Sequence, residues 1–140
     1  MPICFALNYS YYELSVQNWC DDTYYIHGFW PQYNNSDYPT FCNTNAYVPV
    51  TGQLLFDMNK YWNNECNNNQ NLWSHEWEKH GTCMQQQTGI TQNDYFEITI
   101  NLYRQIINTG WKCGATSDCI VACYNLHLES ILCNCYINFP

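Results

Sequence analysis

The stretch LWSHEWEKHGTC, residues 72–83, concentrates two histidines, two glutamates and a lysine in a chain that is otherwise poor in charge. Asn71 or Ser74 can cap a short helix here, and Glu76 would lie in its first turn, where a negative charge is favourable. Gly81 is a suitable residue to end the helix. The pattern therefore predicts about two helical turns over HEWEKH.

One face of this predicted helix carries polar groups only. Trp77 and Glu78 point elsewhere at about 100° per residue, whereas four side chains fall within an arc of about 140°. The helix therefore gathers two imidazoles, a carboxylate and an ammonium group, namely those of His75, Glu76, Lys79 and His80.

A zinc site is the first alternative for this segment. Zinc proteases use H-E-x-x-H, in which two histidines at i and i+4 share a helical face. Here that fifth position is Lys79, and the second histidine comes one residue later. A cation between the two ligands would also oppose a dication. We therefore expect no metal ion and no other cofactor.

The rest of the chain alternates strand and helix patterns. CFALNYS (4–10) and TYYIHGF (23–29) predict strands, the second carrying His27. The segment at 119–137 is rich in strand formers and predicts a hairpin or adjacent strands, in which His127 is an ordinary strand residue. TGQLLFDMNKYW (51–62) has helical spacing and precedes a polar loop at 63–71.

An amphipathic helix is predicted from Thr91 to Gly110, with Thr91 or Asn93 as its cap and Gly110 as its stop. Together these elements predict an α+β fold, in which helices pack on a central, largely antiparallel β-sheet that disulfides stabilise. We expect residues 1–140 to form a single domain, because 140 residues suit one core.

Charge restricts the possible partners. The net charge is −8 and only four residues are permanent cations. A broad basic surface for nucleic acid is therefore excluded, and a polyanion would have to be bound locally. No apolar run approaches the ~18 residues of a membrane span, so we expect no membrane contact.

Ten cysteines indicate disulfides and an oxidising compartment, because the C-terminal cysteines lack the paired C-x-x-C spacing of zinc domains. N-x-S sequons at Asn8 and Asn34 fit a secreted glycoprotein. The N-terminal MPICFALNYS shows no signal peptide, so either a leader has been removed or the protein is made without one. We expect a secreted, lysosomal or vacuolar protein.

Cleavage of RNA needs the groups that this face supplies. A base takes the proton of the 2′-hydroxyl, an acid protonates the departing 5′-oxygen, and a cation stabilises the charge on phosphorus. His27, in YIHGFWPQ, is a third histidine that would allow separate roles. DNA lacks the 2′-hydroxyl and cannot react in this way.

The segments YIHGFWPQYNNSDYPTFC and LWSHEWEKHGTC resemble the two active-site segments of the ribonuclease T2 family, which are acid ribonucleases. The resemblance extends more loosely over about the first 110 residues and is weak beyond. It implies that His80 is the general base, that His27 is the general acid and that His75 binds phosphate. Glu76 and Lys79 would stabilise the transition state and tune the histidines.

The resemblance also implies a base site and a disulfide. Trp30 and Tyr38 would stack on a base while Gln32 reads its edge, and an amide there both donates and accepts hydrogen bonds. Asn8 and Leu72 match a second base site. The implied disulfide joins the two segments through Cys42 and Cys83.

We therefore expect a monomeric endoribonuclease that cleaves single-stranded RNA without a metal, through a 2′,3′-cyclic phosphate. One alternative is a secreted ribonuclease-like module whose binding or signalling role does not depend on turnover. Loss of a catalytic residue would mark that class, and none is lost. A cysteine-rich structural domain would explain the cysteines but not the polar helix face.

Overall fold

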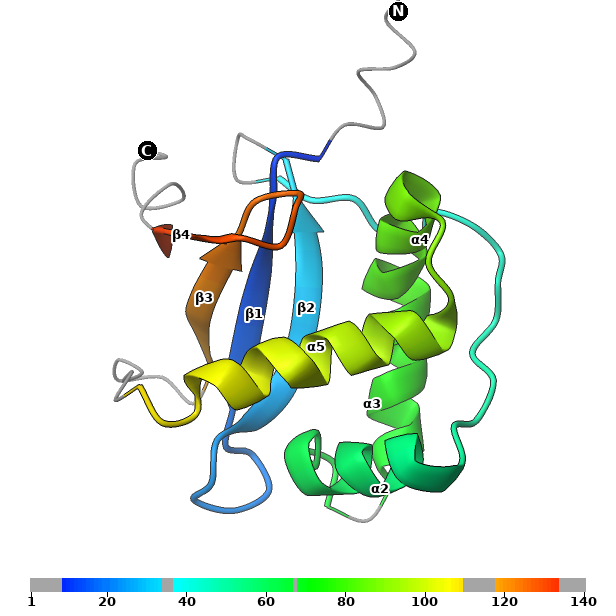
Figure 1. Cartoon of the computed structure of the whole chain (residues 1–140). Helices are drawn as coiled ribbons and strands as arrows, with labels where there is room; N and C mark the ends of the chain where they lie inside the picture. Colours follow the sequence, from blue (N-terminus) through cyan, green and yellow to red (C-terminus); the bar gives the residue numbers. More distant parts are fainter. Residues whose placement is uncertain (1–8, 34–36, 67, 110–117, 134–140) are drawn as a thin grey trace, which may run out of the picture.

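The computed structural model describes residues 9–33, 37–66, 68–109 and 118–133, and it contains a four-stranded antiparallel sheet (Figure 1). The strand order is β2-β1-β3-β4. The strands are β1 (Tyr11–Gln17), β2 (Tyr25–Gln32), β3 (Asp118–Tyr124) and β4 (Ser130–Ile131). The α+β prediction is confirmed.

Two strand predictions are confirmed, and a third, at 4–10, is contradicted only at the two residues of it that the structure describes. β2 falls on the predicted 23–29 segment, and β3 pairs with β4 as a hairpin. His127 lies in the exposed turn of that hairpin and not in a strand. Residues 4–8 of the first predicted strand lie outside the described residues, and Tyr9 and Ser10 are not in a strand. The strand β1 begins at Tyr11, directly after this segment, and was not predicted.

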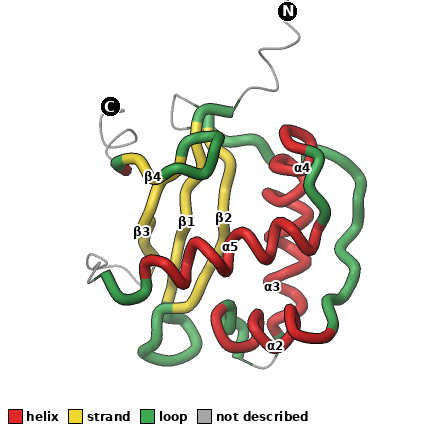
Figure 2. Tube along the Cα trace, in the orientation of Figure 1, coloured by secondary structure: helices red, strands yellow, loops and turns green. Residues whose placement is uncertain are grey.

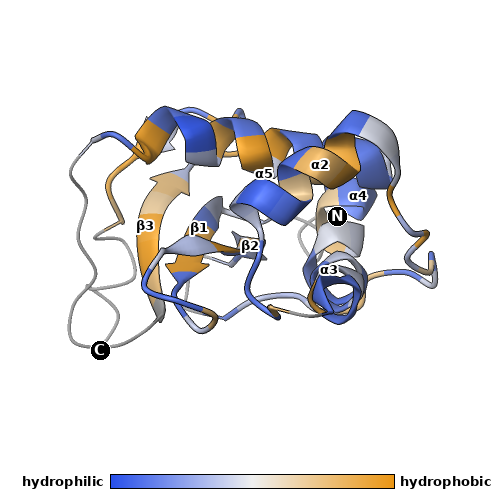
Figure 3. Cartoon of the chain, turned by 90° about the horizontal axis from the view of Figure 1, so that it is seen from below, coloured by the Kyte–Doolittle hydropathy of each residue, from blue (hydrophilic) through white to orange (hydrophobic). Residues whose placement is uncertain are grey.

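The helices lie on one side of the sheet and beside the β2 edge (Figure 2). Seen from below, α2 and α5 lie on the same side of the strands, with α3 nearly end-on (Figure 3). They are α2 (Gly52–Tyr61), α3 (Asn69–Glu76), a π-helical turn η1 (Trp77–Gly81), α4 (Thr82–Thr88) and α5 (Gln92–Ile106).

Helix α5 supplies much of the core. Thr91 caps it through a capping box with Asp94, so the alternative cap, Asn93, lies inside the helix. The helix ends at Ile106, before Gly110, which is outside the described residues. The amphipathic spacing predicted Tyr95, Phe96, Thr99, Leu102 and Tyr103 on its buried face, and all five are buried, together with Ile100. Ile107, which the same pattern placed on this face, is exposed.

The polar helix is longer than predicted. It begins at Asn69, inside the predicted 63–71 loop, with Asn68 rather than Asn71 or Ser74 at its cap position. Gly81 does not stop it, because its φ of −63° is helical. The helix ends instead at Gly89, whose φ of 79° is the left-handed conformation that glycine adopts readily.

Close packing explains the glycine at position 81. A Cβ atom there would collide with the ring of Trp77 and crowd that of Tyr95. Both rings are buried and contact one another at 5.8 Å between centroids. Gly81 therefore lets α5 approach the π-helical turn.

Three complete disulfides lie within the described residues, as the cysteine content predicted: Cys20–Cys66, Cys42–Cys83 and Cys123–Cys133. The first ties the segment after β1 to the segment before α3. The second is the disulfide that the family resemblance implied.

Replacing Gly81 tests this packing. Gly81→Ala should lower the free energy of unfolding by about 1–3 kcal/mol, because the new methyl group overpacks the contact with Trp77 and Tyr95. Urea unfolding with the disulfides intact measures this as a lower midpoint at unchanged slope. Gly89→Asn is the control, since asparagine tolerates the left-handed conformation and the site is open. Equal losses in the two variants would contradict the packing role.

Candidate active site

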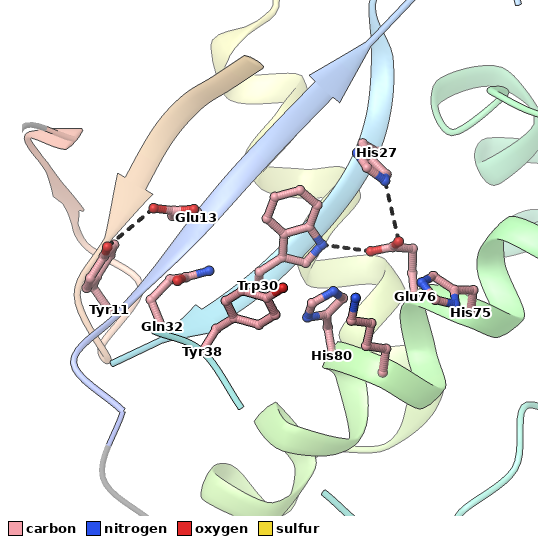
Figure 4. A pocket seen from close by; sticks show the side chains of 10 residues that line it. Tyr11, Glu13, His27, Trp30, Gln32, Tyr38, His75, Glu76 and His80 are labelled. Carbon is pink, nitrogen blue, oxygen red and sulfur yellow. Dashed lines mark hydrogen bonds and ion pairs between the residues drawn. The ribbon is translucent and has the colours of Figure 1, made fainter. Parts of the chain in front are cut away.

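A cavity of about 500 Å³ opens between strands β1 and β2 and the polar helix (Figure 4). It brings together all five predicted catalytic side chains and three of the five predicted base-binding residues. Tyr11 and Glu13 complete its lining, which otherwise consists of His27, Trp30, Gln32, Tyr38, His75, Glu76, Lys79 and His80.

An irregularity in the β1–β2 pairing places His27 in this cavity. Ser15 pairs with Gly28 and Val16 pairs with Ile26, so His27 is an extra residue on β2. In a regular strand, residues 27 and 30 would point to opposite faces of the sheet. The bulge shifts the alternation, so His27 and Trp30 line the same cavity.

Side chains from the helical layer form hydrogen bonds with the backbone along the outer edge of β2. They donate to three of its backbone carbonyls: Asn64 Nδ2 to Ile26 O at 2.6 Å, Trp62 Nε1 to His27 O at 2.9 Å, and the Tyr95 hydroxyl to Phe29 O at 2.8 Å. These bonds surround the extra residue on both sides. They therefore fix the bulge that orients His27.

A buried carboxylate links the helix to β2. Glu76 is 1% exposed and accepts a hydrogen bond from Trp30 Nε1 at 2.7 Å, with its other oxygen 3.6 Å from His27 Nε2. A Cβ atom at Gly28 would collide with both the carboxylate and the indole. A glycine is therefore needed where they meet. The negative charge favours the imidazolium form of His27.

The helical face has the composition that its spacing predicted. Four side chains point into the cavity, and the two expected to point elsewhere make other contacts. Trp77 is buried and donates through Nε1 to Asn45 O at 3.0 Å, while Glu78 accepts from the backbone of Tyr47 at 3.0 Å. The π-helical turn contains Lys79 and His80 and widens the helix locally.

His80 is buried, in contrast to His27. It is 5% exposed, and its Nδ1 atom has no hydrogen-bond partner among the described residues. Burial, together with the positive charges of Lys79, His75 and His27, lowers the pKa of His80 to about 3. The imidazole is therefore neutral in mild acid and available as a proton acceptor. Burial and Lys79 also lower the pKa of His75.

Aromatic rings surround His80 on the open side. The Trp30 ring lies 5.3 Å from the His80 ring and that of Tyr38 lies 6.0 Å away, between centroids. Lys79 Nζ stands 5.7 Å from the centroid of Tyr38, which is 45% exposed. Flat apolar surfaces beside a proton acceptor suit a planar, anionic ligand such as a nucleotide.

Two predicted base-site residues are not found in the cavity. Leu72 belongs to the buried core and does not line it, because the longer helix turns this residue inward. Asn8 lies outside the described residues. Tyr11 and Glu13 also line the cavity, and they were missed because β1 was not predicted. The signal was the spacing of Tyr12, Leu14 and Val16, which belong to the core. Because side chains alternate along a strand, this spacing places Tyr11 and Glu13 on the opposite face of the sheet.

Comparison with known proteins agrees with this arrangement. The model of the "Ribonuclease T2 family" matches residues 3–115. "Ribonuclease T2-like 1-A" of Candida albicans is 32% identical over 117 residues, which cover 67% of this chain and 29% of that protein. "Ribonuclease DdI" of Dictyostelium discoideum is 36% identical over 104 residues, covering 69% and 45%.

The fold is shared with the self-incompatibility-associated SF11-RNase of Nicotiana alata, with a TM-score of 0.67 and 19% identity over 89% of this chain and 91% of that one. The chain belongs to the ribonuclease T2 family. It matches less than half the length of each of the two curated relatives described above.

The buried His80 should make the fold sensitive to acid. Its pKa is about 3 in the folded chain and about 6.5 when unfolded, so between these values only the unfolded chain binds the proton. The stability of the wild type relative to His80→Gln should therefore decrease as pH falls from about 6.5 towards 3. Urea unfolding of both proteins at pH 7 and pH 4 measures this.

The matched control is His127→Gln, which replaces a histidine in an exposed turn. Between pH 7 and pH 4, the wild type should lose stability relative to His80→Gln. It should lose less stability relative to His127→Gln. A difference between wild type and His80→Gln that is the same at both pH values would contradict the burial of a neutral His80.

Proposed function

We propose that the chain is an endoribonuclease that cleaves single-stranded RNA by metal-independent transphosphorylation. The observation that carries this proposal is the placement of two imidazoles in one cavity, one beside a carboxylate and one buried beside a lysine. The two environments favour a protonated His27 and a neutral His80. Membership of the ribonuclease T2 family supports the same reaction.

Each proton in the reaction then has a donor and an acceptor. Neutral His80 accepts the 2′-hydroxyl proton as the 2′-oxygen forms a bond to phosphorus. The bond from phosphorus to the 5′-oxygen breaks, and the His27 imidazolium gives its proton to that oxygen. The products are a 2′,3′-cyclic phosphate and a 5′-hydroxyl end.

The remaining polar groups act on the phosphate and on the acid. Lys79 and His75 line the cavity and would bind the phosphate, with the Lys79 charge stabilising the transition state. Glu76 holds His27 in place and compensates its charge, at 3.6 Å. Its second oxygen is held by Trp30, so the carboxylate keeps a fixed orientation.

The base site would lie beside His80. Trp30 and Tyr38 would stack on a base, and Gln32, whose side chain is buried next to them, would contact its edge. His80 takes the proton of a 2′-hydroxyl, which belongs to the nucleoside on the 5′ side of the cleaved bond. The base that stacks beside His80 therefore belongs to the same nucleoside.

An oxidising compartment suits this protein, secreted or of lysosomal or vacuolar type, because the structure contains disulfides. None of the described helices has the length and apolarity of a membrane span. A binding or signalling module that does not depend on turnover is less consistent with the site, since every proposed catalytic group is present and lines the cavity.

Replacing the acid or the base should abolish most of the activity. The purified protein should cleave RNA in the presence of EDTA and leave cyclic phosphate ends, and DNA should not react. His27→Ala and His80→Ala should each lower the rate by about 10²–10⁴ or more, the range of general acid–base catalysis. A fluorogenic RNA substrate measures the rates.

His127→Ala is the matched control, because this histidine lies in the exposed turn outside the cavity. It should retain full activity. Equal losses in all three variants would mean that folding is impaired and not catalysis. Inhibition by EDTA would instead support a metal mechanism.

The pH dependence of kcat/KM should favour mild acid. The low pKa of His80, about 3, keeps the base neutral throughout mild acid, so protonation of the base should limit the rate only below that range. Loss of the proton from the acid, His27, should lower the rate as pH rises. Steady-state kinetics from about pH 3 to about pH 9 tests this, and a rate that climbs continuously from pH 5 to pH 9 would exclude the paired acid and base.

A further inference from the structure

We propose that Glu13 is a base-reading residue, whose carboxylate accepts hydrogen bonds from the edge of the base that stacks on Trp30 and so favours bases with N–H donors there. The inference rests on the proposed RNA cleavage. It adds to the proposed base site a residue from β1, the strand that the sequence analysis missed.

The strand register places Glu13 beside the stacking ring. Glu13 pairs directly with Trp30, and Tyr11 pairs directly with Gln32. Directly opposed residues in an antiparallel pair project to the same face, with Cβ atoms about 4.5–5.5 Å apart. Glu13 is thus the neighbour of Trp30 across the strands, just as Gln32 is its neighbour along β2. All four residues line the cavity (Figure 4).

The carboxyl group of Glu13 has little hydrogen bonding from the protein. The side chain is 8% exposed, and among the described residues only the Tyr11 hydroxyl donates to it, at 3.3 Å. An ionised carboxylate offers about four acceptor positions. Burial raises the pKa of Glu13, against the opposing effect of the Tyr11 hydrogen bond. Donors on a ligand would therefore supply what the protein does not.

The chemistry of the bases then sets an order of preference. Guanine presents two adjacent donors on its Watson–Crick edge, N1–H and the N2 amino group, which match the two oxygens of a carboxylate. Its O6 acceptor can take a bond from the Gln32 amide. Adenine and cytosine present one amino group each. Uracil presents a single N–H between two carbonyl oxygens, which the carboxylate would repel. We expect guanine first and uracil last.

Cleavage of four dinucleoside phosphates with a constant 3′ base tests the proposal: GpA, ApA, CpA and UpA at pH 7. In the wild type, kcat/KM should be highest for GpA and lowest for UpA. Glu13→Gln keeps the size of the side chain but replaces one acceptor oxygen by a donor. It should lower the ratio of GpA to UpA by about tenfold or more, the effect of losing a hydrogen bond to a charged group.

Two further variants make the result specific. Glu97→Gln removes a carboxylate from the exposed side of α5, outside the cavity, and should leave the ratio unchanged. Glu13→Asp withdraws the carboxylate by one methylene group and should also lower the ratio. This variant tests the proposal if Glu13→Gln shows reduced stability in urea unfolding.

The outcomes separate this inference from the proposed function. A wild type that cleaves none of the four substrates contradicts the ribonuclease function itself. A wild type that cleaves them, with a ratio that stays the same in both Glu13 variants, excludes Glu13 from base reading. An equal loss on all four substrates also overturns the proposal, because it would show a structural role and not selection among bases.

Discussion

The bonding of the outer edge of β2 is the constraint on which the site depends. This strand is at the edge of the described sheet, and three of its carbonyls accept hydrogen bonds from side chains and not from a further strand. Each carbonyl, if buried without a partner, would cost about 1–3 kcal/mol. The donors come from the segment that follows α2 and from α5. These hydrogen bonds therefore fix the position of the helical layer relative to the sheet. His27 lies between two of these bonds.

Within that frame, two imidazoles acquire opposite roles from their surroundings. The carboxylate of Glu76 approaches His27, whereas His80 is buried beside Lys79 and its Nδ1 atom has no hydrogen-bond partner among the described residues. Glu76 can serve His27 only because Gly28 leaves room for both the carboxylate and the Trp30 indole. Because Gly28 has no Cβ atom, Glu76 can contact both His27, the proposed acid, and Trp30 of the proposed base site.

The sequence predicted those parts of the site that depend on local geometry. The shared face of His75, Glu76, Lys79 and His80 follows from about 100° per residue, and the π-helical turn did not remove any of them from the cavity. The placement of His27 was not predictable, because a bulge depends on the register with the partner strand.

The helix boundaries and β1 show why local signals can mislead. Gly81 has the identity of a helix stop, but its function is close packing, which depends on Trp77 and Tyr95 from the folded chain. The strand β1 is buried on both faces, and polar residues such as Ser15 and Gln17 are buried too. Apolar and polar residues alternate along β1, but the alternating residues at 4–10 give a competing strand signal. Of the alternating residues on one face of β1, Tyr11 and Glu13 line the cavity.

Residues 37–51, the described segment that carries Tyr38, contain no helix or strand, but three interactions attach the segment to the polar helix. The disulfide Cys42–Cys83 joins it to α4, and the backbone N–H of Phe41 donates to Lys79 O at 2.8 Å. Thr82 Oγ1 accepts a further bond from the backbone of Cys42 at 3.1 Å. These three attachments lie within one turn of His80. The aromatic ring that would hold a base and the imidazole that would take the proton are therefore fixed to the same segment of helix, so that a base stacked on Tyr38 brings its own ribose towards His80.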